Sequence, residues 1–111
     1  MSGDNAHSEG NATKAFGNNS HAEGYNTEAS GDTSHAEGRE SKAWGFGTHA
    51  EGISCIASKN GAHAEGVNTS ANGPSSHTEG DHTVAWHKST HVFGEYNVED
   101  KVTEEEVVLQ E

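Results

Sequence analysis

One pattern of small, polar and glycine positions repeats along most of this chain with a spacing of 14 residues. A histidine opens each repeat, a glutamate follows two residues later in six of the seven repeats, and glycine follows the glutamate position. The second half of the repeat carries a Thr-x-Ala pair or a close variant of it. The repeating histidines are His7, His21, His35, His49, His63, His77 and His91. A fixed period of this kind predicts a structural unit that stacks on copies of itself.

The length and make-up of the repeat decide which unit this is. Fourteen residues are too few for a helical hairpin, glycine recurs within the repeat, and apolar residues show no helical spacing before the last dozen residues. Two strands of four or five residues joined by tight turns fit this length. We therefore predict an all-β chain in which residues 1–97 form a parallel β-solenoid of about seven coils. Residues 98–111 are predicted to form an acidic and apolar tail, either a short helix or a terminal strand.

Alternation along each predicted strand separates inward from outward residues. The residues on either side of each histidine are small, as in Ser20 and Ala22, and so is the Thr-x-Ala pair, as in Thr27 and Ala29. These positions are predicted to line an interior so narrow that only alanine, serine, threonine and glycine fit.

Histidine and glutamate point outward by the same alternation, yet they hardly vary, whereas the other outward positions vary freely. A solvated face has no reason to stay uniform, so we predict that this face packs against copies of the same chain. The predicted ladder along the axis of this homo-oligomer consists of His7, Glu9, His21, Glu23, His35, Glu37, His49, Glu51, His63, Glu65, His77, Glu79 and His91.

Composition affects the predicted fold less than the repeat does. Only 13 of the 111 residues are Leu, Ile, Val or Phe, and the formal net charge is −12, which is typical of disordered chains. The repeat overrules that interpretation. Basic residues are scattered singly, which argues against nucleic acid as a partner. No apolar run approaches the ~18 residues of a membrane span, and residues 1–4 do not resemble the start of a secretory signal.

A known family shows the same repeat. The unit Ser-His-Ala-Glu-Gly-x-x-Thr-x-Ala-x-Gly, as in residues 20–31, resembles the head repeat of trimeric autotransporter adhesins, the YadA-like family, which reads Asn-Ser-Val-Ala-Ile-Gly with the same period. Its His-Ala-Glu-Gly form is similar to repeats in tail-fibre and neck-appendage proteins of phages and prophages. The resemblance covers residues 5–97. The places of His21 and Glu23 are taken by Val and Ile in the adhesins, so a polar seam replaces an apolar one here.

The resemblance implies a left-handed parallel β-roll, a homotrimer with the first strand of each coil facing the axis, and a location in a virion tail appendage or at a cell surface. The expected function is that of a non-enzymatic, cofactor-free fibre module that gives rigidity and presents a binding surface. One alternative is a tip that binds a cell-surface glycan or receptor through outward aromatic residues, because exposed aromatic side chains are enriched in recognition surfaces. The candidates are Phe16, Tyr25, Trp44, Phe46 and Trp86.

The ladder itself has two chemical interpretations. Imidazolium and carboxylate groups form charge-assisted hydrogen bonds, and such ionic pairing would raise the pKa of the folded histidines. Imidazole and carboxylate are also ligands for zinc, nickel, iron or manganese, so a metal-binding fibre segment is the other interpretation.

Three smaller features complete the sequence-based picture. At the end of the repeats Val92, Phe93 and Tyr96 introduce larger apolar side chains and are predicted to cap the roll. Cys55 occupies an inward threonine position and is predicted to be a small buried residue. The off-register His82 and His87, with Asp81 and Lys88, predict an exposed polar patch at the turns of the sixth coil. No catalytic combination of side chains stands out from the repeat.

Overall fold

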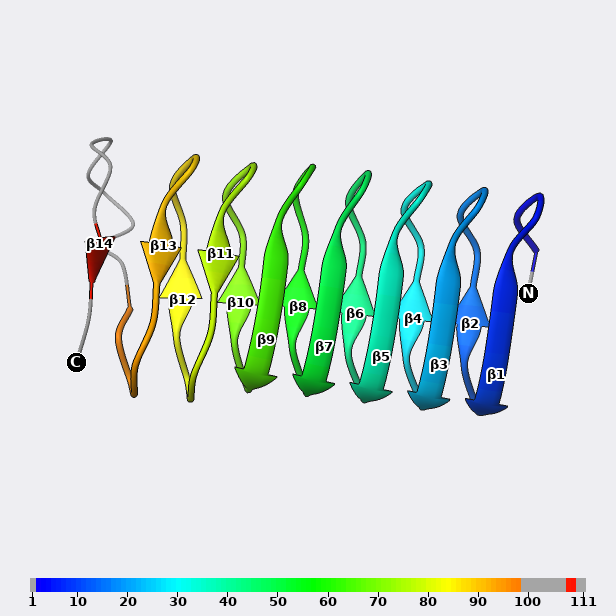
Figure 1. The fold of residues 1–111 in the computed structure, drawn as a ribbon, viewed down its shortest axis with the longest axis horizontal. Coiled ribbons are helices and arrows are strands. Elements are labelled where there is room, and N and C mark those ends of the chain that lie inside the picture. The colour runs from blue at the N-terminus through cyan, green and yellow to red at the C-terminus, as the bar shows by residue number, and fades with distance from the viewer. Residues whose placement is uncertain (1, 99–107, 110–111) are drawn as a thin grey trace.

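All regular elements among the described residues are β-strands. The computed structural model describes residues 2–98 and 108–109, and five-residue strands alternate with two-residue strands along most of it (Figure 1). The first sheet contains β1 (His7–Asn11), β3 (His21–Tyr25), β5 (His35–Arg39), β7 (His49–Ile53), β9 (His63–Val67), β11 (His77–Thr78), β13 (His91–Val92) and β14 (Val108–Leu109). The second contains β2 (Lys14–Ala15), β4 (Glu28–Ala29), β6 (Lys42–Ala43), β8 (Ile56–Ala57), β10 (Ser70–Ala71) and β12 (Val84–Ala85).

The two sheets are parallel and are built coil upon coil, which confirms the predicted solenoid. Each strand pairs with the strand two elements later, and the partners are one repeat apart, as in His7 with His21 and Lys14 with Glu28. Because the coil length equals the repeat length, equivalent positions of the repeat lie beside one another along the stack. The coils extend over 38 Å and the molecule is only 14 Å across its shortest axis (Figure 1).

The stack has about six turns, where the sequence predicted about seven. Six pairs of strands are complete, but β13 has no second strand after it within the described residues, and Val98 forms only an isolated bridge to Val84. Strand β14 pairs with β13 instead. The two residues of β14 are the described part of the predicted helix-or-strand tail; residues 99–107 and 110–111 of that tail lie outside the described residues.

The second strand of each coil is shorter than the predicted four or five residues. In the second coil a left-handed residue, Asn26, stands two positions before β4, and the bend at Gly31 begins two positions after it. Only Glu28 and Ala29 remain extended between these two turns. The alternation of the sequence does not reveal where the backbone turns, so it overestimated the strand.

The interior is lined by small side chains, as predicted. Ser20, Ala22, Thr27 and Ala29 are all buried, and the same positions are buried in the following coils. Buried hydroxyl groups donate to carbonyl oxygens of the turns, as in Ser20 Oγ to Gly17 O at 2.6 Å and Thr27 Oγ1 to Glu23 O at 3.1 Å. Hydrogen bonds of this kind make a polar lining tolerable, although the buried Thr78 Oγ1 has no hydrogen-bond partner.

Stacking of backbone compensates for the missing large side chains. The accessible surface of the chain is 5689 Å², close to the roughly 5,900 Å² that is expected for a compact monomer of this mass. The coils therefore bury an ordinary share of surface through close backbone contacts. Among the described residues there is no helix long and apolar enough to cross a membrane.

The turns contain residues with positive φ in every coil, and this leads to our first prediction. Thr33 has φ 59° in a place where other coils have Asn19, Gly47 or Gly61, and left-handed backbone disfavours a β-branched residue. We expect Thr33→Asn to increase the free energy of unfolding by roughly 1 kcal/mol. Urea unfolding followed by circular dichroism measures the change.

The control introduces threonine at the equivalent turn position of another coil. Gly61→Thr adds a β-branched residue at φ 71°, where a Cβ has room because its nearest neighbour, Ser75 Oγ, is 3.5 Å away. It is expected to decrease stability by a similar amount. An unchanged or lower stability of Thr33→Asn would show that this turn is not strained.

Candidate functional site

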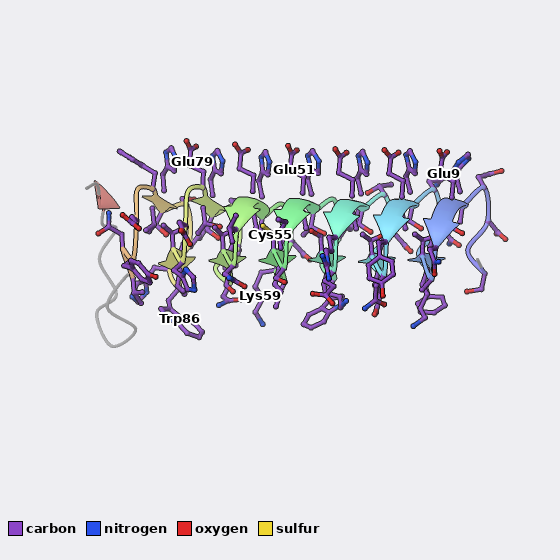
Figure 2. The ribbon with its side chains drawn as sticks, turned by 90° about the horizontal axis from the view of Figure 1, so that it is seen from below. Glu9, Glu51, Cys55, Lys59, Glu79 and Trp86 are labelled. Carbon is purple, nitrogen blue, oxygen red and sulfur yellow. The ribbon has the colours of Figure 1, made fainter. Side chains whose placement is uncertain are left out.

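The histidines and glutamates form a continuous ladder along one face of the first sheet. Each histidine opens its strand and the glutamate two residues later points to the same side, because side chains alternate along a strand. Figure 2 shows Glu9, Glu51 and Glu79 in one row along this side, with Cys55 inside the roll. The parallel pairing places His35 beside His49 and Glu37 beside Glu51. The pairing thus brings together the residues predicted for the ladder.

The imidazole rings stack on one another from coil to coil. From His21 to His91, neighbouring ring centroids are 4.5–4.8 Å apart and the rings are within 12° of parallel. The first ring differs, since His7 meets His21 edge to face at 67°. The spacing of the rings matches the spacing of parallel strands, so the sheet itself sets the stack.

From His7 to His77, each ladder histidine has its Nε2 close to a glutamate oxygen of its own coil. The distance from Nε2 to Oε1 is 2.9 Å for His35 and Glu37 and 3.0 Å for His49 and Glu51. The same carboxylates also approach the histidine of the next coil, with 4.0 Å between Glu37 and His49 and 3.6 Å between Glu65 and His77. The ladder therefore alternates nitrogen and oxygen atoms along the whole stack.

The ring nitrogens are shielded without being hydrogen-bonded. The side chains from His21 to His91 and the glutamates between them are 34–42% exposed. The Nε2 atoms of five of these histidines are nevertheless covered and have no hydrogen-bond partner. The five are His21, His35, His49, His63 and His77. In the terminal coils His7 and His91 do have carboxylate partners, Glu9 and Glu79.

The pKa shifts of two ladder histidines contradict the ionic interpretation of the ladder. The pKa of His35 is lowered from its ordinary 6.5, first by desolvation and then by the neighbouring His49 and His21, and these effects outweigh the attraction of Glu37 and Glu23. Burial followed by repulsion from His77 and His49 lowers the pKa of His63 in the same way, against Glu65 and Glu51. Stacking thus favours neutral imidazole, and the expected increase in histidine pKa is wrong for these two residues.

Our second prediction follows from the direction of these shifts. Because the pKa of His35 and His63 is lower in the folded chain than in the unfolded chain, the unfolded chain takes up protons first as the pH falls. Stability is therefore fully present above about pH 6.5 and is lost as the pH falls below it. We expect a lower melting temperature at pH 5 than at pH 8, measured by differential scanning calorimetry with EDTA present. A melting temperature that increases on acidification would instead support ionic pairing.

The aromatic residues proposed for partner contacts all lie at the surface. Phe16, Tyr25, Trp44, Phe46 and Trp86 are between 36% and 60% exposed. Phe16, Trp44 and Trp86 each follow the inward alanine of a second-sheet strand, and Figure 2 places Trp86 on the side opposite the glutamate row. Tyr25 ends strand β3, where the Arg39 guanidinium lies 5.6 Å from its ring centre.

The three residues predicted to cap the roll have different positions in the structure, one inside it and two outside. Val92 is completely buried in the alanine position, so a larger apolar side chain does enter the interior at this end. Phe93 takes the glutamate position on the outer face, where its ring lies 5.0 Å from that of His91. Tyr96 is 65% exposed and stacks on His82, so it does not fill the interior. Its left-handed backbone at a turn keeps its side chain outside the sheet.

Two remaining predictions concern Cys55 and His82. Cys55 is fully buried among the inward alanines and threonines, with Sγ 3.2 Å from Gly66 O. His82 pairs with Asp81 at the surface, as the predicted polar patch requires. The sequence did not lead us to predict that the His82 ring stacks on the ring of Tyr96, which lies in the equivalent turn of the next coil. The shared 14-residue spacing of these two residues was the signal available for it.

The ladder is the chemically distinctive feature of the described chain. The described residues enclose no pocket. Sets of two histidines and one glutamate recur in successive coils with their ligand atoms within 4.8 Å of one another, as in His35, Glu37 and His49. Comparison of the sequence with models of known protein families and with curated proteins finds no match.

Proposed function

We propose that this chain is a non-enzymatic structural module of a trimeric fibre, in which three copies pack their histidine and glutamate ladders around a common axis. Each copy is a left-handed roll whose first sheet faces that axis. The fibre belongs to a phage tail appendage or to a bacterial surface adhesin, as the resemblance of the repeat implies.

The observation that carries this proposal is the contrast between the two faces of the roll. The ladder face repeats the same two side chains in register, and its shielded Nε2 atoms have no hydrogen-bond partner within the chain. Next to the inward alanines of the second sheet, by contrast, Phe16, Ser30, Trp44 and Ser58 succeed one another. A face that meets identical faces across an axis has reason to stay uniform, and partner chains offer the missing polar contacts.

The opposite face supports a role in presentation. Its exposed aromatic side chains give a rigid rod an adhesive surface, since tryptophan and tyrosine combine a large apolar area with a polar group. A second candidate function, a glycan- or receptor-binding tip, uses this surface. Binding to a glycan array that is lost in Trp44→Ala would favour the tip over a passive shaft.

The mass in solution tests the proposed trimer. Light scattering coupled to size-exclusion chromatography at neutral pH is expected to give three times the chain mass of 11.7 kDa, about 35 kDa. A folded particle with the mass of one chain would overturn the proposal, because the ladder would then be a free surface.

A pair of variants locates the interface, and this is our third prediction. His49→Glu adds a carboxylate beside Glu37 and Glu51 in every copy, and like charges brought together at an interface are unfavourable. We expect this variant to dissociate into monomers. Ser70→Glu, placed on the second sheet in the position that Glu28 holds in another coil, is the matched control and is expected to remain trimeric. Circular dichroism checks that both variants are folded.

A further inference from the structure

The ladder offers nitrogen and oxygen donors at the separation that a metal chelate requires. Two ligands that are each about 2.1 Å from one ion and at a right angle to each other lie about 3.0 Å apart. The Nε2 to Oε1 distances are 2.8 Å for His21 and Glu23, 2.9 Å for His35 and Glu37, and 3.0 Å for His49 and Glu51. In each of these coils the strand therefore presents a two-donor chelate without any change of its backbone.

The direction of these contacts also fits a chelate better than a hydrogen bond. In a right-angled chelate the oxygen lies about 45° off the axis of the nitrogen lone pair, because the ion and not the oxygen occupies that axis. In the five central coils Nε2 is within 3.4 Å of the carboxylate but makes no hydrogen bond to it, as such an arrangement requires. A hydrogen-bonded pair would have the oxygen on the axis.

The charge of the ladder favours a cation. Glutamates of successive coils lie side by side, as Glu37 and Glu51 do, and like charges in directly paired positions destabilise a sheet. The whole chain also has a formal net charge of −12. Divalent cations bound in alternate coils offset this repulsion.

We propose that the ladder binds divalent transition-metal ions of the zinc and nickel class, in a row that follows the coils. Each ion is held by Nε2 and Oε1 of one coil, with the histidine of the next coil as a third ligand. Because the lone pair of one Nε2 binds only one ion, the ions occupy alternate coils. The three donor atoms lie within 4.8 Å of one another in sets such as His49, Glu51 and His63. A tetrahedral site needs about 3.4 Å between donors, so the third side chain must move inward by about 1 Å. These side chains are one-third exposed and have room to rotate.

The choice of metal follows from the donors. Imidazole nitrogen suits zinc, nickel and copper, whereas calcium and magnesium require oxygen ligands. The inference does not depend on the proposed trimer, because each set comes from one chain. In a trimer, donors from the other two copies would replace water, and ions shared on the axis would lower the number bound per chain.

Metal titration of the full chain tests the proposal. Protein treated with EDTA and then freed of it is titrated with zinc chloride or nickel chloride by isothermal calorimetry, and elemental analysis counts the bound ions. We expect more than one ion per chain in a monomer, or more than one per three chains in a trimer, and no binding of calcium or magnesium. Fewer bound ions, or equal binding of calcium, would overturn the inference.

Two variants separate the ladder from adventitious sites. Replacing Glu37, Glu51 and Glu65 with glutamine keeps the stacked rings but removes the anionic donor from three of the six coils that carry one, and is expected to lower the number of zinc ions bound per chain. His87→Gln, which changes a histidine outside the ladder, is expected to leave binding unchanged. An equal number of bound zinc ions in the glutamine variant and the parent chain would overturn the proposal, provided circular dichroism shows both to be folded.

The same samples distinguish this inference from the proposed function. A metal-free trimer that binds no zinc would overturn the metal row and leave the fibre module standing. A monomer that binds several zinc ions would overturn the fibre module and leave the metal row standing.

Discussion

Gly52→Ala is expected to unfold the middle of the solenoid. A Cβ at this position would lie 2.1 Å from the carbonyl oxygen of Gly66 in the next coil, and the backbone has φ +115°, a value that side chains strongly disfavour. Steric overlap with backbone and the conformational penalty both oppose the substitution, so we expect a loss of roughly 3 kcal/mol or more. Urea unfolding of the variant, followed by circular dichroism, measures this loss.

Gly47→Ala provides the matched control for this experiment. Its φ of +67° is also left-handed, but the nearest atom to an added Cβ is Thr33 Oγ1 at 3.9 Å. The same chemical change without steric overlap is expected to cost only about 1 kcal/mol. Similar losses at the two glycines would mean that backbone conformation, and not the close approach of the coils, explains the glycine position.

Ala57→Leu is the second substitution with a large expected effect. Ala57 is fully buried in β8, between Ala43 and Ala71 of the neighbouring coils, and the interior holds only small side chains there. Three additional carbon atoms have no space, and overpacking of a rigid core costs about 1–3 kcal/mol or more. We expect a loss near the upper end of this range, because the two sheets are too close to separate locally. The midpoint of urea unfolding reports it.

The neighbouring residue supplies the control. Ser58 follows Ala57 directly but lies outside, in the position that Trp44 and Trp86 hold in other coils. Ser58→Leu removes one hydrogen bond, from Oγ to Asn72 Oδ1 at 2.8 Å, and is expected to change stability by about 1 kcal/mol or less. If leucine were tolerated equally at both positions, the interior would be wider than the structure indicates.

The stacking that makes these two substitutions costly also explains the unusual composition. Large side chains are absent from the interior because each coil is closed by backbone contacts to its neighbours, as at Gly52 and Gly66. Val92, at the end of the described stack, is the exception that fills an alanine position. Coil stacking therefore stabilises this fold as an apolar core stabilises most domains of this size.

Much of the candidate site was predictable from the sequence because the repeat length equals the coil length. A residue and its counterpart 14 positions later must then be neighbours, so the histidines and the glutamates had to form columns. The outer position of Phe93 was also implied, since it takes the place of a glutamate. What the spacing alone did not contain was the contact between columns, as in Glu37 with both His35 and His49.

The sequence by itself determined the β-solenoid, its small-residue interior and the composition of the ladder, because period and alternation fix which residues become neighbours and which side they occupy. Only the tertiary structure decided the two-residue length of strands such as β4, the outward position of Tyr96, and the burial and ring stacking that lower the pKa of His35. These depend on left-handed turn residues and on ring orientation and desolvation. Such properties arise from three-dimensional packing and have no counterpart in a linear spacing.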